Sequence, residues 1–257
     1  MKAAYLKAKN QFEIREVEVR EPEAGEVLVG VKACGFCGHD KILASYAGEE
    51  WQPFGHEFAG VVEKVGHGVK NVKVGDRVVV ETSIFDPISD YARNGRPDLD
   101  TEGPNYMTME HTGMGFAEKT IVPAILCVPF SELEDREACF LEPMGVATDL
   151  ILTADIHLGQ DVLLMGCGAI GLFTGGLSSI LDNAPTYMTF FEMAKASGAR
   201  NIYVAEHKAN QKKIELAKQF GATDVILTDE MELTDYPFPR GGVDRVLVTT
   251  PPVTIAE

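Results

Sequence analysis

Residues 161–171 read DVLLMGCGAIG, an apolar run followed by three glycines in the spacing GxGxxG. The run predicts a buried strand, and the glycines predict a tight turn into a helix, where a pyrophosphate can approach backbone N–H groups. A glycine-rich turn that binds nothing shares this spacing. The strand before the motif favours a dinucleotide site, whose contacts we expect from Gly166, Gly168, Ala169, Ile170 and Gly171.

The chain around this motif alternates between apolar strands and helices. We predict one helix over residues 135–152 and two more over 193–199 and 210–222, with strands over 201–206, 224–228 and 243–250. Such alternation is typical of parallel βαβ units. It predicts a doubly wound sheet that begins the strand order 3-2-1-4-5-6.

An acidic residue closes the second predicted strand of this series. Glu206 would accept hydrogen bonds from the adenosine ribose hydroxyls, and its charge would repel a 2′-phosphate, which favours NAD over NADP. Glu206 lies 35 residues after Gly171, whereas about 20 is usual. We therefore expect an insertion within residues 175–190, where Gly175-Gly176 and Pro185 interrupt the first helix before it restarts near Thr186.

Short strands separated by Gly, Pro and Asn-Gly turns occupy the first 130 or so residues. We expect them over residues 2–8, 12–19, 26–33, 58–65, 76–81 and 116–122. This pattern predicts a β-rich barrel or sandwich. Between residues 130 and 155 the pattern of short strands gives way to alternating strands and helices. We therefore predict two domains, 1–145 and 146–257, in an α/β chain with a β-rich N-terminal half.

Composition narrows the class of protein. Among 257 residues, 39 acidic side chains outnumber 23 basic ones, and the net charge of −16 opposes binding to nucleic acid. Five scattered cysteines and a start without an apolar segment favour a reducing cytoplasm. Residues 162–181 carry no charge and reach the length of a membrane span, but their five glycines favour a buried α/β segment, so we expect no membrane insertion.

Thiol, imidazole and carboxylate groups recur at four places in the first half of the chain. His56 stands beside Glu57 before an apolar strand, Cys37 lies upstream, and Glu142 lies in the motif FLEPMG. These are the ligand types that zinc takes in catalytic sites with one open position. Cys34 and Cys37 also form a CxxC that could be a redox pair, although Cys34 ends a strand and such a pair needs a helix start.

Residues 55–69, GHEFAGVVEKVGHGV, resemble the zinc signature of the medium-chain zinc-dependent alcohol and polyol dehydrogenases. The resemblance extends through VKACGFCGHD, VKVGDRVVV, GFAEK, LEP and GCGAIG, and so covers nearly the whole chain. It implies a GroES-like β-barrel catalytic domain followed by a Rossmann domain. The family's Rossmann domain has two halves, and we expect only the first here, without the strand that makes the common homo-oligomer contact.

The resemblance also implies roles for single residues. Cys37, His56 and Glu142 match the family's ligands to one catalytic zinc ion, and Glu57 matches a carboxylate that either binds the metal or lies just outside it. His39, Asp40 and Glu57 are the expected catalytic residues: Asp40 resembles the acid that orients the zinc histidine, and His39 replaces a threonine or serine that passes the substrate proton. No structural zinc is expected, because residues 81–126 contain no cysteine.

Glutamate at position 142 is the residue that polyol and sugar dehydrogenases of this family carry. The resemblance therefore implies zinc- and NAD-dependent oxidation of a secondary alcohol on a small polyol or sugar-like substrate, by hydride transfer. The alternative is a zinc-binding scaffold or regulatory protein of the same fold that is catalytically impaired. The shortened Rossmann half and the interrupted helix favour this alternative.

Overall fold

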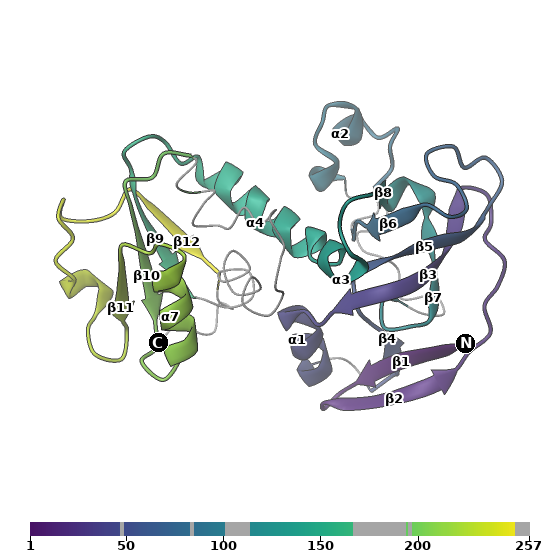
Figure 1. Ribbon diagram of the computed structural model, residues 1–257, viewed down its shortest axis with the longest axis horizontal. Helices are drawn as coiled ribbons and strands as arrows, with labels where there is room; N and C mark the ends of the chain where they lie inside the picture. Colours follow the sequence, from purple (N-terminus) through teal and green to yellow (C-terminus); the bar gives the residue numbers. More distant parts are fainter. Residues whose placement is uncertain (47–48, 83–84, 101–113, 167–193, 195–196, 250–257) are drawn as a thin grey trace. The chain divides into compact units, whose positions relative to one another are not determined.

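The structure is a computed structural model, and it describes the chain except residues 47–48, 83–84, 101–113, 167–193, 195–196 and 250–257 (Figure 1). The described chain divides into two compact units, Met1–Glu142 and Pro143–Glu257. The sequence had placed this division after residue 145. Within the described residues, no helix is both long and apolar enough to cross a membrane.

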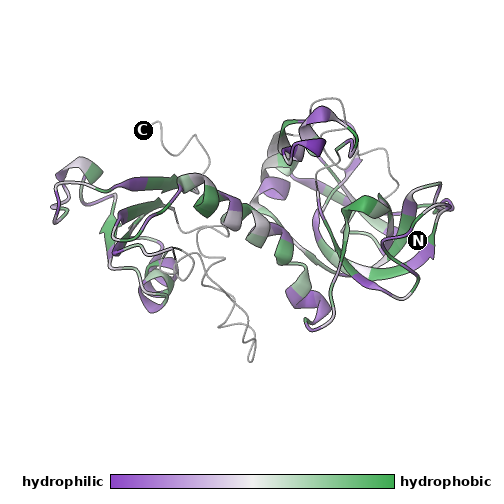
Figure 2. Ribbon diagram, turned by 90° about the horizontal axis from the view of Figure 1, so that it is seen from above, coloured by the Kyte–Doolittle hydropathy of each residue, from purple (hydrophilic) through white to green (hydrophobic). Residues whose placement is uncertain are grey.

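The first unit is built on two antiparallel sheets. The larger has the order β7-β3-β5-β6-β8, and the smaller has the order β2-β1-β4. Their strands are β1 (Lys2–Lys7), β2 (Gln11–Glu16), β3 (Glu26–Gly35), β4 (Gln52–Pro53), β5 (Glu57–Val65), β6 (Arg77–Val80), β7 (Lys119–Pro123) and β8 (Cys127–Pro129). Hydrophobic and hydrophilic residues are interspersed along these strands (Figure 2). The six predicted strands are all present, with β4 and β8 in addition.

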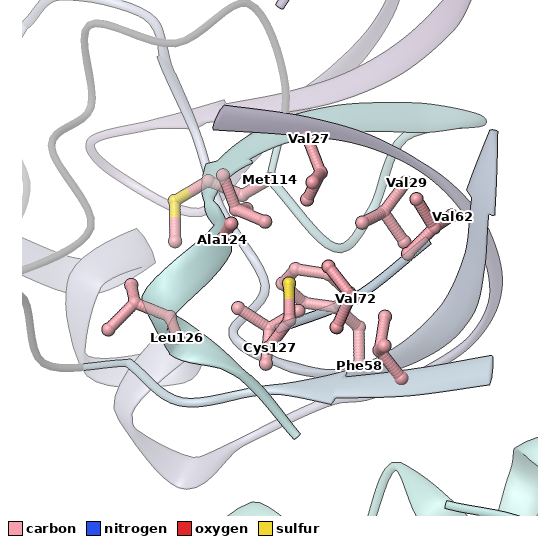
Figure 3. Close-up of a cluster of buried hydrophobic side chains, with 12 residues drawn as sticks. Val27, Val29, Phe58, Val62, Val72, Met114, Ala124, Leu126 and Cys127 are labelled. Atoms are coloured by element: carbon pink, nitrogen blue, oxygen red, sulfur yellow. The ribbon is translucent and has the colours of Figure 1, made fainter. Parts of the chain in front are cut away.

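Valine-rich strands form the core of this unit. Side chains from β3, β5 and the β7–β8 connection point into one interior cluster (Figure 3), which includes Val27, Val29, Phe58, Val62 and Leu126. Gly60 on β5 lets two strands approach, since a Cβ there would lie 2.5 Å from the carbonyl oxygen of Gly30 on β3. The glycines of the zinc signature are therefore needed for strand packing as well as for turns.

Short helices connect these strands. They are α1 (Gly38–Tyr46), α2 (Asp90–Arg93), α3 (Asp135–Ala138) and the 3-10 turns η1 (Pro97–Leu99) and η2 (Ala124–Leu126). The prediction of one helix over residues 135–152 is wrong, because α3 ends at Ala138 and α4 (Leu141–Ala154) begins anew. Pro143 explains the break: it has no N–H for the carbonyl four residues earlier, and it is tolerated only in the first turn of a helix.

The second unit contains a parallel sheet in the order β11-β10-β9-β12. Its elements are β9 (Asp161–Met165), β10 (Asn201–Glu206), α7 (Gln211–Gln219), β11 (Asp224–Leu227), η3 (Leu233–Asp235) and β12 (Arg245–Val248). In sequence terms this order is 3-2-1-4, as predicted for the start of a doubly wound fold. The interrupted helix expected within residues 175–190 lies outside the described residues, as do residues 193, 195 and 196 of the helix expected over 193–199, whose residues 197 and 198 form a turn.

Both faces of this sheet are covered. On one face, Val162 and Ile202 pack with Ile151 of α4 and Ala217 of α7. On the other face, Leu163 and Tyr203 pack against the segment that follows β11, through Leu233, Tyr236, Phe238 and Val243. Near-continuous apolar strands need such coverage, which explains why β9 and β10 show no alternation of polar residues.

Candidate metal centre and nucleotide site

Sheet pairing brings together the chemically active residues of the first unit. Strands β3 and β5 are antiparallel neighbours, with Cys34 opposite Phe58 and Gly35 opposite Glu57. The end of β3 therefore lies beside the start of β5. Cys37 follows the end of β3, and His56 precedes β5 by one residue. Residues far apart in sequence meet here because of this register.

Three candidate ligands converge at this edge. One ligand atom each from Cys37, His56 and Glu57 lie within 4.8 Å of one another, and His56 and Glu57 are buried. A thiolate, an imidazole and a carboxylate are a donor set that suits zinc. Glu142, expected from the sequence as a ligand, is not part of this set.

Asp40 lies beside His56, one of the three candidate ligands. Its Oδ2 accepts a hydrogen bond from the Cys37 N–H at 2.9 Å, and its Oδ1 lies 3.6 Å from His56 Nδ1. Oδ1 is buried and has no hydrogen-bond partner among the residues that the structure describes. An N–H at Nδ1 of His56 would supply one and leave the other ring nitrogen to a metal, as carboxylate partners do for metal-binding histidines. The residues therefore fit a zinc ion.

Burial shifts the pKa values of these groups in the metal-free protein. It raises the pKa of Cys37 to about 12, and nearby Glu57 adds to the effect. Burial also raises the pKa of Glu57 and lowers that of His56. A metal ion would lower the pKa of Cys37 and Glu57 and release their protons on binding, whereas the lowered pKa of His56 already favours the neutral ring that a metal needs. The CxxC alternative finds no support, because burial raises the pKa of Cys34 as well, and redox-active thiols need a lowered one.

His39 lies on the solvent side of the set. Its backbone N–H donates to Cys37 Sγ at 3.4 Å, and its ring centroid lies 6.1 Å from that of His56. The residue is exposed. It is therefore open to solvent at the first turn of α1.

Glu142 is half-buried in the first turn of α4. Burial, followed by repulsion from Glu57 and Asp40, raises its pKa to about 7, and a hydrogen bond with Thr82 opposes that rise. The carboxylates of Asp40, Glu57 and Glu142 thus share one electrostatic environment, which a cation would relieve.

Sequence reasoning missed two residues next to the candidate ligands. Thr82, whose hydroxyl contacts Glu142, belongs to no recognisable motif. Gly35 leaves room for Glu57, since a Cβ at this position would lie 2.2 Å from Glu57 Oε2. The signal for Gly35 is its pairing with Glu57, which becomes visible only once the register of β3 and β5 is known.

The second unit positions the candidate nucleotide residues that the structure describes. Glu206 ends β10 and is only 6% exposed. Its Oε1 accepts hydrogen bonds from the His207 N–H at 2.9 Å and from Asn210 Nδ2 at 2.7 Å, and its Oε2 lies 3.6 Å from Lys213 Nζ. Sequence reasoning missed Asn210 and Lys213. Their contacts hold the carboxylate at the end of the strand, where ligands of this fold class bind.

The glycine motif is only partly described. Gly166 follows β9 with a φ of +94°, which favours glycine, and its N–H donates to the carbonyl of Ala205 on the neighbouring strand. The remaining expected contacts, Gly168, Ala169, Ile170 and Gly171, lie outside the described residues.

Two family models match parts of the chain. The alcohol dehydrogenase GroES-like domain matches residues 23–132, which contain Cys37, His56 and Glu57. A citrate transport model matches residues 168–226, or 59 of 257 residues. The described part of that second range consists largely of β10, α7 and β11, which belong to the parallel sheet unit.

Known dehydrogenases are similar over most of the chain. (R,R)-butanediol dehydrogenase of Bacillus subtilis is 32% identical over 100% of this chain and 73% of its own length. D-xylulose reductase of Saccharomyces cerevisiae is 30% identical over 81% of this chain and 55% of its own length. A solved Escherichia coli alcohol dehydrogenase complexed with NADH has a TM-score of 0.80 and 27% identity, covering 98% of this chain and 69% of that one.

The chain thus spans between about half and three quarters of the lengths of these two curated relatives. Zinc-binding dehydrogenases with bound NADP or NADH are among the structural neighbours, so zinc and NAD(P) are the cofactors expected of such a protein. The fold order, the GroES-like match and the similarity to butanediol dehydrogenase lead to one assignment. This chain belongs to the medium-chain zinc-dependent alcohol dehydrogenase family.

Proposed function

We propose that the protein takes part in the zinc- and NAD-dependent oxidation of a secondary alcohol on a small polyol or sugar-like molecule. The observation that carries this proposal is the approach of Cys37, His56 and Glu57 within 4.8 Å of one another. The buried Oδ1 of Asp40, which lies 3.6 Å from His56 Nδ1 and has no hydrogen-bond partner within the described part of the chain, supports it.

Each residue near the set has a task in this proposal. Cys37, His56 and Glu57 hold the zinc ion, and Asp40 fixes the orientation and tautomer of His56. Zinc supplies Lewis acidity that lowers the pKa of a substrate hydroxyl, and NAD⁺ supplies the hydride acceptor. His39, exposed beside Cys37, carries the released proton to solvent.

The substrate class follows from charge and ligand type. The candidate site contains the thiol of Cys37 and three carboxylates, which are those of Asp40, Glu57 and Glu142. Oxygen donors make a harder, more polar metal site than a set rich in thiolates, which favours a substrate that approaches through two oxygens. The names of the butanediol and xylulose relatives support a vicinal diol.

NAD is the proposed acceptor because of Glu206. A buried carboxylate at the end of β10 accepts hydrogen bonds from ribose hydroxyls and repels a 2′-phosphate. Lys213, 3.6 Å away, offsets part of that charge. The preference for NAD over NADP therefore rests on the carboxylate's position rather than on an isolated negative charge.

Metal analysis tests the proposal first. Purified protein should contain about one zinc ion per chain, and Cys37→Ala should lose it. Cys127→Ala is the matched control, because Cys127 is a buried core thiol outside the candidate set. Full retention of zinc by Cys37→Ala would refute the site.

Cofactor and substrate tests follow on the same preparation. Calorimetric titration should show saturable binding of NAD⁺ in preference to NADP⁺, and a screen of vicinal diols, polyols and sugars should give NADH at 340 nm. Zinc retention without NAD⁺ binding would instead support the alternative of a zinc-binding scaffold.

A further inference from the structure

Strand β2 is the outer strand of the smaller sheet in the first unit, beside β1 (Figure 1). At its end, the Val17 N–H donates to the Met1 carbonyl at 2.9 Å, and the Met1 amino group donates to the Val17 carbonyl at 2.9 Å. Because such bonded positions alternate in an antiparallel pair, the backbone groups of Phe12, Ile14 and Glu16 point away from β1. These groups have no partner among the residues that the structure describes.

The edge of β2 lacks the features that usually keep a sheet edge from pairing with another chain, which include short length, proline, lysine and bulges. The other edge strands described in the first unit carry them: β4 has two residues, β7 ends at Pro123, and β8 ends at Pro129. Strand β2 instead runs for six residues, QFEIRE, and pairs regularly with β1. It exposes two large apolar side chains, Phe12 at 49% and Ile14 at 74%. The edge is therefore open to a further strand.

The charges of β2 select one way in which two copies can pair. A two-fold axis makes the strands antiparallel, and outward backbone groups must meet outward backbone groups. With the axis beside Ile14, Glu13 of each copy faces Arg15 of the other. An axis at Glu13, Arg15 or Glu16 would place two like charges opposite each other, which is destabilising. An axis at Phe12 would leave half of β2 unpaired.

We propose that β2 is the interface with a second copy of this chain, in which the two strands pair antiparallel about Ile14. The pairing joins two small sheets into one, and the Ile14 side chains of the two copies cover each other. Glu13 also forms an ion pair with Arg15 of its own chain, so the four side chains alternate in charge across the interface. A six-residue edge is small, so the association is weak and depends on protein concentration.

Sedimentation velocity over about 1 μM to 1 mM protein tests the interface. The wild-type chain should shift from monomer to dimer as the concentration rises. Ile14→Lys places two cations opposite each other and should weaken the dimer at least about 10-fold. Ile88→Lys is the matched control, because Ile88 is 76% exposed and lies outside β2. It should dimerise as the wild type does, and both variants should keep the wild-type thermal unfolding, since both side chains are exposed.

A charge exchange tests the register. Glu13→Arg alone and Arg15→Glu alone each place like charges opposite each other, so each should weaken the dimer. The double variant restores opposite charges only if the axis lies beside Ile14, and it should regain dimerisation. Registers centred on Glu13 or Arg15 keep two like charges opposite each other in the double variant as well.

Four results would overturn the proposal. They are a wild-type chain that stays monomeric over this range, a dimer that survives Ile14→Lys, an equal loss caused by Ile88→Lys, and a double variant that dimerises no better than the single variants. None of these results depends on bound zinc or NAD, so the proposed function is tested separately.

Discussion

Gly35→Ala should weaken metal binding far more than it weakens the fold. The added Cβ would lie 2.2 Å from Oε2 and 3.2 Å from Cβ of Glu57, on the opposite strand. Gly35 does not have a positive φ, so the backbone accepts alanine and the conflict is steric only. The carboxylate end of Glu57 is flexible and can turn away. This rotation moves the Glu57 carboxylate away from Cys37 and His56.

The magnitude follows from which atoms must move. Overpacking in a well-packed site costs about 1–3 kcal/mol, and the low end applies because most of the clash is relieved at the carboxylate. Displacing a carboxylate from a metal should cost at least about 10-fold in affinity, or roughly 1.4 kcal/mol. We therefore expect a small decrease in thermal stability of the metal-free protein, together with a large decrease in zinc affinity.

The assay is competition for zinc with a chromophoric chelator, alongside thermal unfolding of the metal-free protein. Gly38→Ala is the matched control: it lies three residues away, beside Cys37, and an added Cβ there meets no atom within 4 Å. It should bind zinc as the wild type does. A folded Gly35→Ala protein with wild-type zinc affinity would refute the assignment of Glu57 as a ligand.

Two further predictions concern stability. Gly60→Ala should lower the free energy of unfolding by about 1–3 kcal/mol, because its Cβ would lie 2.5 Å from the backbone oxygen of Gly30. Gly145 lies in helix α4 with open space around an added Cβ, so Gly145→Ala should raise the stability slightly in thermal denaturation rather than lower it. Asp244 accepts a hydrogen bond from the Asp161 N–H at 2.7 Å, and this bond lowers its pKa below the usual 3.8. A carboxyl group whose pKa is lower in the folded state stabilises the fold at pH values above its unfolded-state pKa. This stabilisation is lost as the pH falls through the folded-state pKa. Asp244→Asn should thus be less stable than wild type at neutral pH, and chemical denaturation should show the difference shrinking below about pH 4; a constant difference down to pH 2 would contradict this.

The raised pKa values of the candidate ligands suit a site that acquires its cation after folding. Burial raises the pKa of Cys37, Glu57 and Glu142, because it penalises each negative charge. A raised pKa reduces the mutual repulsion of these three groups, since each stays protonated over a wider pH range. The metal-free first unit can therefore remain folded while keeping the donors in place.

The sequence by itself determined the class of fold. Apolar runs of strand length, the alternation after residue 130 and the glycine turn at 166–171 predict a β-rich unit followed by a parallel sheet, and the observed order β11-β10-β9-β12 agrees. Such features are local, since side-chain periodicity and glycine conformation depend on neighbours in the chain. The assignment of Cys37 and His56 as ligands also came from sequence, and it stays a prediction.

Tertiary structure alone decided how the candidate carboxylates are arranged. Glu57 and Glu142 are equivalent in ligand chemistry, but the register of β3 and β5 brings Glu57 to Cys37 and His56, whereas Glu142 lies outside this converging group. Register depends on two irregularities in the β3–β5 pairing, between Leu28 and Val29 and between Val31 and Ala33. Each shifts the alignment of the two strands, and a one-residue slip would turn every side chain to the other face. No local pattern records that choice, because it is made between strands more than twenty residues apart.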